Sequence, residues 1–317
     1  MESNRMNQVT EAQAQDSLAS ISDLGLGAKS RTRSWLWAVA LAVAPLVAAC
    51  GTEVAGGSEG LEGLEGLEGE PVVAAAAEEA FPGRSGEVST AVLETEQGQD
   101  TVSYELIDGN MVMEGDIILG RSSGQYTAQS AIVKSRRWPG CVIPYEIDPN
   151  MSGQKRVLDA IKHWHDKTAV TLVPRKGEQD YVLFSSRESG CSSAIGRSGG
   201  RQVVNLGSSC STGNAIHEIG HALGMFHEQS RQDRDDFITV NLANVESSKR
   251  NNFNKYQSAS GTDLGKFDFG SIMLYGSYFF SANKKPTMVR KNGTTFEAQR
   301  NGLSAGDLAA PAKICGQ

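Results

Sequence analysis

Apolar residues recur at helical spacing between positions 152 and 169 of this 317-residue chain. They lie three or four residues apart, which places them on one face of an α-helix: Val157, Ile161, Trp164 and Thr168. Ser152 precedes them and suits the cap position, because a serine hydroxyl can accept a backbone N–H of the first helical turn. We therefore expect a helix over Ser152–Ala169 that buries this face. His163 and His165 are expected at its surface or at the edge of the core.

Short β-like runs flank this helix, at residues 141–147, 170–173, 181–185 and 201–206. A second helix is expected over residues 212–224 and a helical stretch near 245–256, whereas turn residues dominate from position 228 onward. This order predicts an α+β fold with two halves, the second of them largely irregular. The run 201–206 is expected to be an edge strand, whose main chain could pair with an extended peptide in the cleft between the halves.

The first 49 residues have the pattern of an export signal. An apolar run of 15 residues, at positions 35–49, is short for a membrane span. The basic residues before it are Lys29, Arg31 and Arg33. The run ends in Val-Ala-Ala-Cys50, which resembles the lipobox of bacterial lipoproteins, where the cysteine carries the lipid and becomes the mature N-terminus. Ordinary cleavage before an unmodified Cys50 is the alternative. We expect an exported precursor that is anchored to a membrane through Cys50.

Composition and charge change along the chain. Residues 51–90 are of low complexity, with a Gly-Leu-Glu repeat and an alanine run, which indicates a flexible tether. Residues 50–129 carry 2 basic and 16 acidic side chains, whereas residues 130–317 carry 24 Lys and Arg against 17 Asp and Glu. The two parts are expected to attract each other, unless the acidic part is simply a soluble linker. We divide the chain into a signal at 1–49, a tether and leader at 50–129, and one domain at 130–317.

Three histidines in one stretch indicate a metal site. His217 and His221 are four residues apart, so both lie on one face of the second expected helix and can reach one ion. Gly224 can take a left-handed conformation that ends the helix and turns the chain back, which brings His227 in as a third ligand. Three neutral nitrogens with an open position are typical of one catalytic zinc ion. Glu218 is placed to reach a metal-bound water instead of the metal.

These residues form the motif HExxHxxGxxH, and the chain around them resembles the astacin family of metzincin zinc endopeptidases. The likeness rests on four further segments: Glu228-x-x-Arg231-x-Asp-Arg-Asp after the third histidine, Ser271-Ile-Met273-Leu-Tyr275 as the family's Met-turn, Trp138-Pro-Gly-Cys-Val-Ile-Pro-Tyr as the start of its catalytic domain, and Cys191 to Cys210 before the zinc helix. The resemblance covers about residues 130–317. It implies an astacin-like catalytic domain of two subdomains, with the zinc helix between a small mixed sheet and an irregular C-terminal half.

The resemblance also implies roles for single residues. Glu218 would take a proton from the attacking water and pass it to the leaving amine. Tyr275 would be a fifth zinc ligand that can swing away and hydrogen-bond the oxyanion, and Met273 would form an apolar floor beneath the histidines. Glu228 would receive the ammonium of the processed N-terminus, unless it only supports a neighbouring ligand. Arg300 would bind an acidic side chain just after the cleaved bond, unless it is an ordinary surface arginine.

Four cysteines remain after Cys50, an even number in an exported chain, which implies two disulfides with three possible pairings. The resemblance favours the pair Cys191–Cys210. The pair Cys141–Cys315 then remains, and it would staple the two ends of the domain. The family's long-range bridge usually starts elsewhere, so this second pairing departs from the family pattern.

A motif before the domain predicts latency. Met113-Glu-Gly-Asp116 resembles the family's pro-segment motif, whose aspartate occupies the water site on zinc, with a surface Gly-Asp turn as the alternative. Processing between residues 125 and 138 would then free the domain from Cys50. The predicted function is that of a monomeric zinc endopeptidase, periplasmic or extracellular, which acts on extended protein or peptide substrates and not on nucleic acid. The alternative is a surface-binding protein that keeps the fold without turnover, and the intact Glu218 argues against it.

Overall fold

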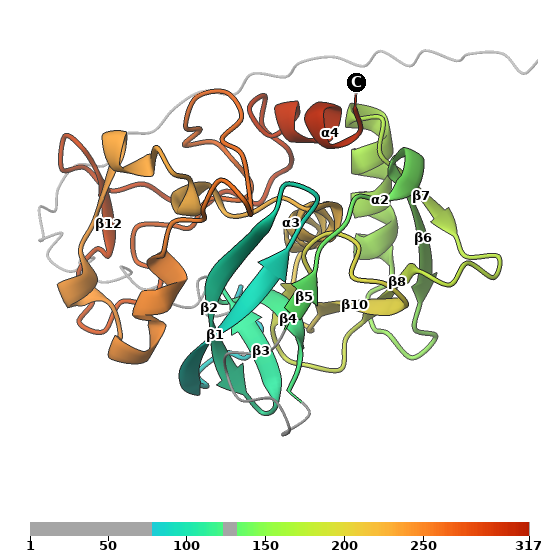
Figure 1. Ribbon diagram of the computed structural model, residues 1–317, viewed down its shortest axis with the longest axis horizontal. Helices are drawn as coiled ribbons and strands as arrows, with labels where there is room; N and C mark the ends of the chain where they lie inside the picture. The colour runs from blue at the N-terminus through green and yellow to red at the C-terminus, as the bar shows by residue number, and fades with distance from the viewer. Residues whose placement is uncertain (1–77, 123–131, 317) are drawn as a thin grey trace, which may run out of the picture. The chain divides into compact units, whose positions relative to one another are not determined.

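The computed structural model describes residues 78–122 and 132–316 of the chain (Figure 1). The expected signal sequence, Cys50 and most of the expected tether lie outside the described residues. We call residues 78–122 the leader segment and residues 132–316 the main domain. Neither of these ranges contains a helix that is both long and apolar enough to span a membrane.

A ten-stranded sheet runs through both parts, in the order β5-β1-β2-β3-β4-β9-β10-β8-β6-β7. The leader segment supplies β1 (Glu87–Glu94), β2 (Gln99–Ile107), β3 (Asn110–Met113) and β4 (Ile117–Arg121). The main domain supplies β5 (Ile132–Lys134), β6 (Val142–Ile147), β7 (Thr171–Pro174), β8 (Tyr181–Ser185), β9 (Cys191–Ser193) and β10 (Arg201–Leu206). The leader strands form an antiparallel meander. In the main domain β7, β6, β8 and β10 run parallel, and β9 is antiparallel to β10.

The leader strand β4 joins the sheet of the main domain at the short strand β9. Ile117 pairs with Ser193 in parallel, and Ser193 N–H donates to the carbonyl of Asp116 at 3.1 Å. The prediction that residues 201–206 form the edge strand is therefore wrong, because β10 lies between β8 and β9. A strand of three residues carries too little alternation to be detected from the sequence, which is why β9 was missed.

Helix α2 (Lys155–Lys167) confirms the first expected helix with a shorter span. Its cap is Gln154, without a side-chain cap hydrogen bond, so the prediction of Ser152 as cap is wrong. The buried face consists of Val157, Ala160, Ile161 and Trp164. The Trp164 indole N–H donates to the carbonyl of Ile216 at 3.1 Å and so joins α2 to the next helix.

Helix α3 (Thr212–Leu223) carries the metal motif and lies between the sheet and the C-terminal half (Figure 1). It begins with a reciprocal cap, in which Ser211 and Asn214 satisfy each other's backbone N–H groups. It ends at Gly224, whose φ of 119° is in the left-handed region that favours glycine. Both ends of the helix are therefore fixed by local sequence, and the last turn has the geometry that the metal motif predicts.

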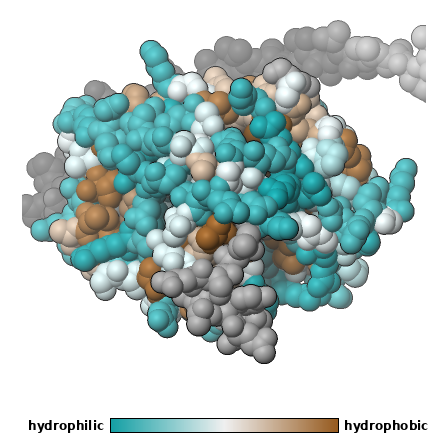
Figure 2. All heavy atoms as spheres, in the orientation of Figure 1, coloured by the Kyte–Doolittle hydropathy of each residue, from teal (hydrophilic) through white to brown (hydrophobic). Residues whose placement is uncertain are grey.

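The C-terminal half is largely irregular, as expected. It contains the strand pair β11 (Ile238–Val240) and β12 (Met288–Arg290), the short helix α4 (Ala309–Ile314), and the 3-10 turns η2 (Glu228–Ser230), η3 (Arg234–Asp236), η4 (Leu242–Asn244) and η5 (Ser247–Phe253). A further 3-10 turn, η1 (Pro139–Cys141), precedes β6. The helical stretch expected near residues 245–256 is thus a 3-10 segment and not an α-helix. The face seen in Figure 2 is mostly hydrophilic, with hydrophobic residues in separate patches.

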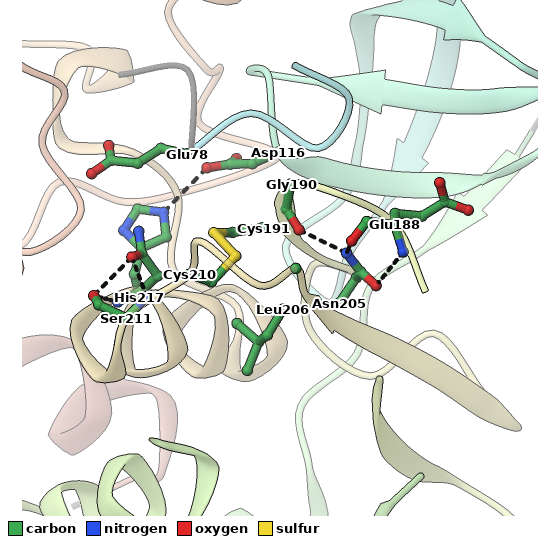
Figure 3. The surroundings of a disulfide bond; sticks show 12 residues. Glu78, Asp116, Glu188, Gly190, Cys191, Asn205, Leu206, Cys210, Ser211 and His217 are labelled. Atoms are coloured by element: carbon green, nitrogen blue, oxygen red, sulfur yellow. Dashed lines mark hydrogen bonds and ion pairs between the residues drawn. A yellow bond between two sulfur atoms is a disulfide. The ribbon is translucent and has the colours of Figure 1, made fainter. Parts of the chain in front are cut away.

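Both predicted disulfides are present. Cys141–Cys315 joins the start of the main domain to its C-terminal end, with 5.5 Å between the Cα atoms. Cys191–Cys210 links β9 to the residue before the cap of α3, with 6.0 Å between the Cα atoms (Figure 3). The second bridge therefore ties β9, the strand that pairs with the leader segment, to the helix that carries the metal motif.

Candidate metal centre and active site

The three motif histidines converge on one point and are buried. His217 and His221 come from one face of α3, and His227 follows the turn at Gly224. The Nδ1–H of His217 donates to the carbonyl of Ile272 at 2.8 Å, and that of His221 donates to the carbonyl of Met225 at 2.7 Å. His227 Nδ1 lies 2.8 Å from Glu114 Oε2 in the leader segment. Each Nδ1 is thus engaged, which orients each ring and leaves its Nε2 for a metal.

The spacing of the ligand atoms fits a tetrahedral zinc ion. With bonds of about 2.0–2.1 Å, the ligand atoms of a tetrahedron lie about 3.3 Å apart. His217 Nε2 and His227 Nε2 are 3.3 Å apart, and each is 3.2 Å from Asp116 Oδ2. His221 Nε2 is 3.4 Å from Asp116 Oδ1. These four side chains form a group whose candidate ligand atoms all lie within 4.8 Å of one another.

Two buried atoms of this group also indicate an ion. Asp116 Oδ1 and His221 Nε2 have no hydrogen-bond partner among the described residues, although both are fully enclosed. Unsatisfied buried polar atoms are costly, and a metal ion held between them would satisfy both. Because three imidazoles and one carboxylate suit zinc well, the donor set and the spacing agree on the same ion.

Glu218 lies next to the cluster on α3 and is 1% exposed. Its Oε2 has no hydrogen-bond partner among the described residues. Burial, and then the nearby carboxylate of Asp116, raise the pKa of Glu218 well above its ordinary value. A carboxyl group in this position is close to the metal ligands without being one of them. It can therefore hold a proton at the site.

Met273 and Tyr275 flank the cluster from the C-terminal half. Met273 Sδ would be 3.0 Å from a Cβ at Gly220, so the missing side chain of this glycine lets the methionine pack against α3 in the turn between His217 and His221. The ring of Tyr275 lies 4.4 Å from that of His227, and its hydroxyl donates to the carbonyl of Glu114. The tyrosine is thus beside the metal centre and engaged by the leader segment, and its role as a zinc ligand stays a prediction.

Glu228 directly follows the third histidine and is half-buried. Its Oε1 accepts the N–H of Asp268 at 2.7 Å and lies 3.4 Å from Arg231 Nη1. Burial raises the pKa of Glu228 to about 7. It lines a cavity of about 180 Å³ that is also lined by residues 135–137, near the predicted start of the processed domain. The carboxylate therefore faces a space next to that start, and its capture of a new N-terminus stays a prediction.

Arg300 is not an exposed surface residue. Its Nη2 lies 2.6 Å from Glu78 Oε2 of the leader segment, and the two side chains are 11% and 10% exposed. Its Nη1 donates to the carbonyls of Gln299 at 2.8 Å and Leu274 at 3.3 Å. Figure 3 shows Asp116 joined to His217, with Glu78 nearby. Arg300 thus lies against the first turn of α3 and is paired with the leader segment, and its role in binding an acidic side chain of the substrate stays a prediction.

Two site residues were missed from the sequence, and two histidines were rightly left out. Glu114 belongs to the latency motif and could have been noticed there, whereas Glu78 stands in an alanine-rich run without any signal. His163 Nε2 accepts the N–H of Leu303 at 3.0 Å, and His165 Nε2 accepts the N–H of Leu172 at 2.9 Å. Both histidines thus hold loops and strands against α2, away from the metal cluster.

Comparisons with known proteins agree with this geometry. The family Astacin (Peptidase family M12A) matches residues 130–314. The chain is 37% identical over 225 residues to Blastula protease 10 of Paracentrotus lividus, which covers 67% of this chain and 36% of that protein. It is also 37% identical over 224 residues to Protein SpAN of Strongylocentrotus purpuratus, which covers 66% of this chain and 36% of that protein. The chain thus spans about a third of the length of these two relatives.

A solved structure has the same fold. High choriolytic enzyme 1, a hatching enzyme zinc-protease from Oryzias latipes (Medaka fish), is 32% identical with a TM-score of 0.52, covering 57% of this chain and 94% of that one. Three convergent imidazoles, a glutamate beside the first of them and a methionine packed against the same helix are typical of a zinc-peptidase type of site. The chain belongs to the astacin family, and its metal is one zinc ion.

Proposed function

We propose that this chain is a zinc-dependent endopeptidase that is made as a latent precursor. The observation that carries the proposal is the approach of the Asp116 carboxylate to all three histidine Nε2 atoms, with Oδ2 at 3.2 Å from those of His217 and His227 and Oδ1 at 3.4 Å from that of His221. A leader carboxylate thus takes the fourth position, where a catalytic zinc site keeps a water or substrate. Removal of the leader segment would open this position and leave three histidine ligands.

The residues around the open position have suitable chemistry. Bound zinc would supply a water of lowered pKa and would polarise the scissile carbonyl. Glu218 takes the proton of the attacking water and delivers it to the leaving amine, because it is the carboxyl group beside the ligands. When the leader segment departs, the Tyr275 hydroxyl loses its hydrogen-bond acceptor, the carbonyl of Glu114. This hydroxyl is then free to donate to the oxyanion.

The substrate is an extended protein or peptide chain. Departure of β4 frees the edge of β9, and a substrate main chain can pair with that edge in its place. This proposal replaces the wrong assignment of residues 201–206 as the edge. Arg300 binds an acidic side chain just after the cleaved bond, and the pairing of its guanidinium with the Glu78 carboxylate in the precursor supports this role.

Export and membrane release complete the proposal. The signal-like sequence and Cys50 support an exported, lipid-anchored precursor, and processing between residues 125 and 138 separates the main domain from the anchor. The released domain acts as a monomer in the periplasm or outside the cell. Cell fractionation checks this part: the precursor should be found with membranes and the active form in the soluble fraction after a salt wash. An active form that still carries lipid would contradict it.

The alternative is a binding protein that keeps the fold without turnover. Hydrolysis of a peptide library by the processed chain and its Glu218→Ala variant distinguishes the two functions. We expect the variant to keep one zinc ion and to lose about 10²–10⁴-fold in activity, the usual contribution of a general base. Equal and negligible hydrolysis by both proteins, each loaded with zinc, would favour the binding protein.

A further inference from the structure

A second part of the leader segment lies in the same cleft as Asp116. Residues 78–81 precede β1, and the N–H of Ala80 donates to the carbonyl of Gly115 at 2.9 Å. On the other side, residues 78–81 pack against Gly190, where an added Cβ would be 1.7 Å from the carbonyl oxygen of Glu79. The segment therefore passes between the turn that carries Asp116 and the residue before β9, so its path is closely fixed.

Glu78 ends this segment at Arg300. The carboxylate and the guanidinium lie 2.6 Å apart, and both side chains are about nine-tenths buried. Burying two charges costs free energy that only close pairing offsets, so removal of either partner leaves the other charge uncompensated. In the described residues, Arg300 is the partner of the Glu78 carboxylate.

The guanidinium is held in place by the main domain and not by the leader segment. Its Nη1 is fixed by the carbonyls of Gln299 and Leu274, and the backbone of Arg300 lies against Gly213 in the first turn of α3. Its Nε has no hydrogen-bond partner among the described residues. Loss of Glu78 would therefore leave a fixed guanidinium with free donors beside α3, ready for another carboxylate.

We propose that Glu78 occupies the subsite of the substrate's acidic side chain, so that the leader segment blocks the active site at two points. Asp116 blocks the metal, and Glu78 blocks the Arg300 subsite. This inference rests on the proposed endopeptidase function, and it adds a residue that no sequence motif indicates. The leader segment is then partly a substrate mimic, since it presents a carboxylate to the same guanidinium that selects the substrate.

The test uses unprocessed full-length chains in which the metal block has been removed by Asp116→Ala. Glu78→Gln is added to this variant, because glutamine keeps the shape of glutamate and removes its charge. Glu87→Gln is the matched control, since Glu87 is an exposed glutamate of the leader segment. Hydrolysis is measured with two fluorogenic peptides that differ only in Glu or Gln just after the cleaved bond.

Glu78→Gln should raise hydrolysis of the Glu peptide by roughly a hundredfold or more over Asp116→Ala alone, as expected when one partner of a buried charge pair loses its charge. The gain on the Gln peptide should be smaller, and Glu87→Gln should change neither rate. No gain, or an equal gain on both peptides, would overturn the proposal.

Processed enzyme without the leader segment separates this inference from the proposed function. If the processed enzyme hydrolyses neither peptide, the endopeptidase function itself is wrong. If it prefers the Glu peptide while Glu78→Gln has no effect on the precursor, only the proposed block of the Arg300 subsite by Glu78 is wrong.

Discussion

Lys249 of the main domain holds the leader segment by charge, and its loss should release that segment. Its Nζ lies 3.0 Å from Glu105 Oε2 and 3.8 Å from Glu79 Oε2, and it donates to the carbonyl of Arg84 at 2.7 Å. All three partners belong to the leader segment. Glu105 is fully buried, and its other oxygen accepts the N–H of Gly86 at 3.1 Å. Lys249→Met keeps the length of the side chain and leaves this buried carboxylate without its cation.

Breaking a buried pair by removing one partner costs about 3–5 kcal/mol. Here the cost falls on docking of the leader segment, which should weaken by roughly a hundred- to several-thousand-fold. After processing, gel filtration and mass spectrometry show how much of the cleaved leader segment stays bound to the main domain, and so measure this loss. Unfolding of the processed main domain should be unchanged, because the charge of Lys249 is not needed once its leader partners are gone.

Lys255→Met is the matched control. Lys255 Nζ lies 2.7 Å from Asp235 Oδ2, but this pair belongs to the main domain and is exposed, so it should contribute less than about 1 kcal/mol. Lys255→Met should retain the leader segment as the wild type does. The reasoning is refuted if Lys249→Met also retains the leader segment at wild-type strength, or if it destabilises the processed domain as much as the precursor.

Two further predictions concern stability and pH. Replacing Cys141 and Cys315 by serine should lower the free energy of unfolding of the main domain by about 5 kcal/mol, since the bridge closes a loop of 174 residues. Denaturant unfolding measures this change, and a loss below about 1 kcal/mol would contradict the prediction. Burial raises the pKa of Glu79 from 4.5 to about 7, so its contribution to leader docking is complete below about pH 4.5 and is lost as the pH rises through about 7. The charged groups around it are Lys249, Glu246, Glu105 and Asp116. After processing, the leader segment should thus dissociate faster at about pH 8 than at about pH 6, and Glu79→Gln should remove this difference. An unchanged pH profile in that variant would show that Glu79 is not the group responsible.

The metal helix could be predicted in detail because its signals are local. The spacing of His217 and His221 fixes their common face, and Gly224 has the left-handed conformation that ends the helix and brings in His227. The buried stripe of α2 was predicted for the same reason. Its cap was not, since a cap depends on where the first hydrogen bond forms, and Ser152 lies three residues before the first helical residue, Lys155.

Features that depend on distant parts of the chain could not be predicted from spacing. The Glu78–Arg300 pair joins residues 222 positions apart, and nothing near either residue indicates the other. Residues 201–206 were wrongly assigned as an edge strand because three-residue β9, which pairs with them, gives no periodic signal, although its position decides where a peptide can bind. The pair Cys141–Cys315 remained only after the resemblance had favoured Cys191–Cys210, and it departs from the family pattern. The expected position of Asp116 followed from the family resemblance and not from the residues alone.

Hydrolysis by the unprocessed chain tests the central claim most directly. Asp116→Ala removes the leader carboxylate that completes the zinc site, and Asp116→Ala with Glu218→Ala is the control for any contaminating protease. We expect the unprocessed Asp116→Ala chain to cleave slowly a short peptide that the unprocessed wild type leaves intact, and the double variant to leave it intact as well. The rate should stay below that of the processed enzyme, because β4 still covers the edge of β9. An Asp116→Ala chain that binds zinc and is as inactive as the wild-type precursor would contradict the central claim.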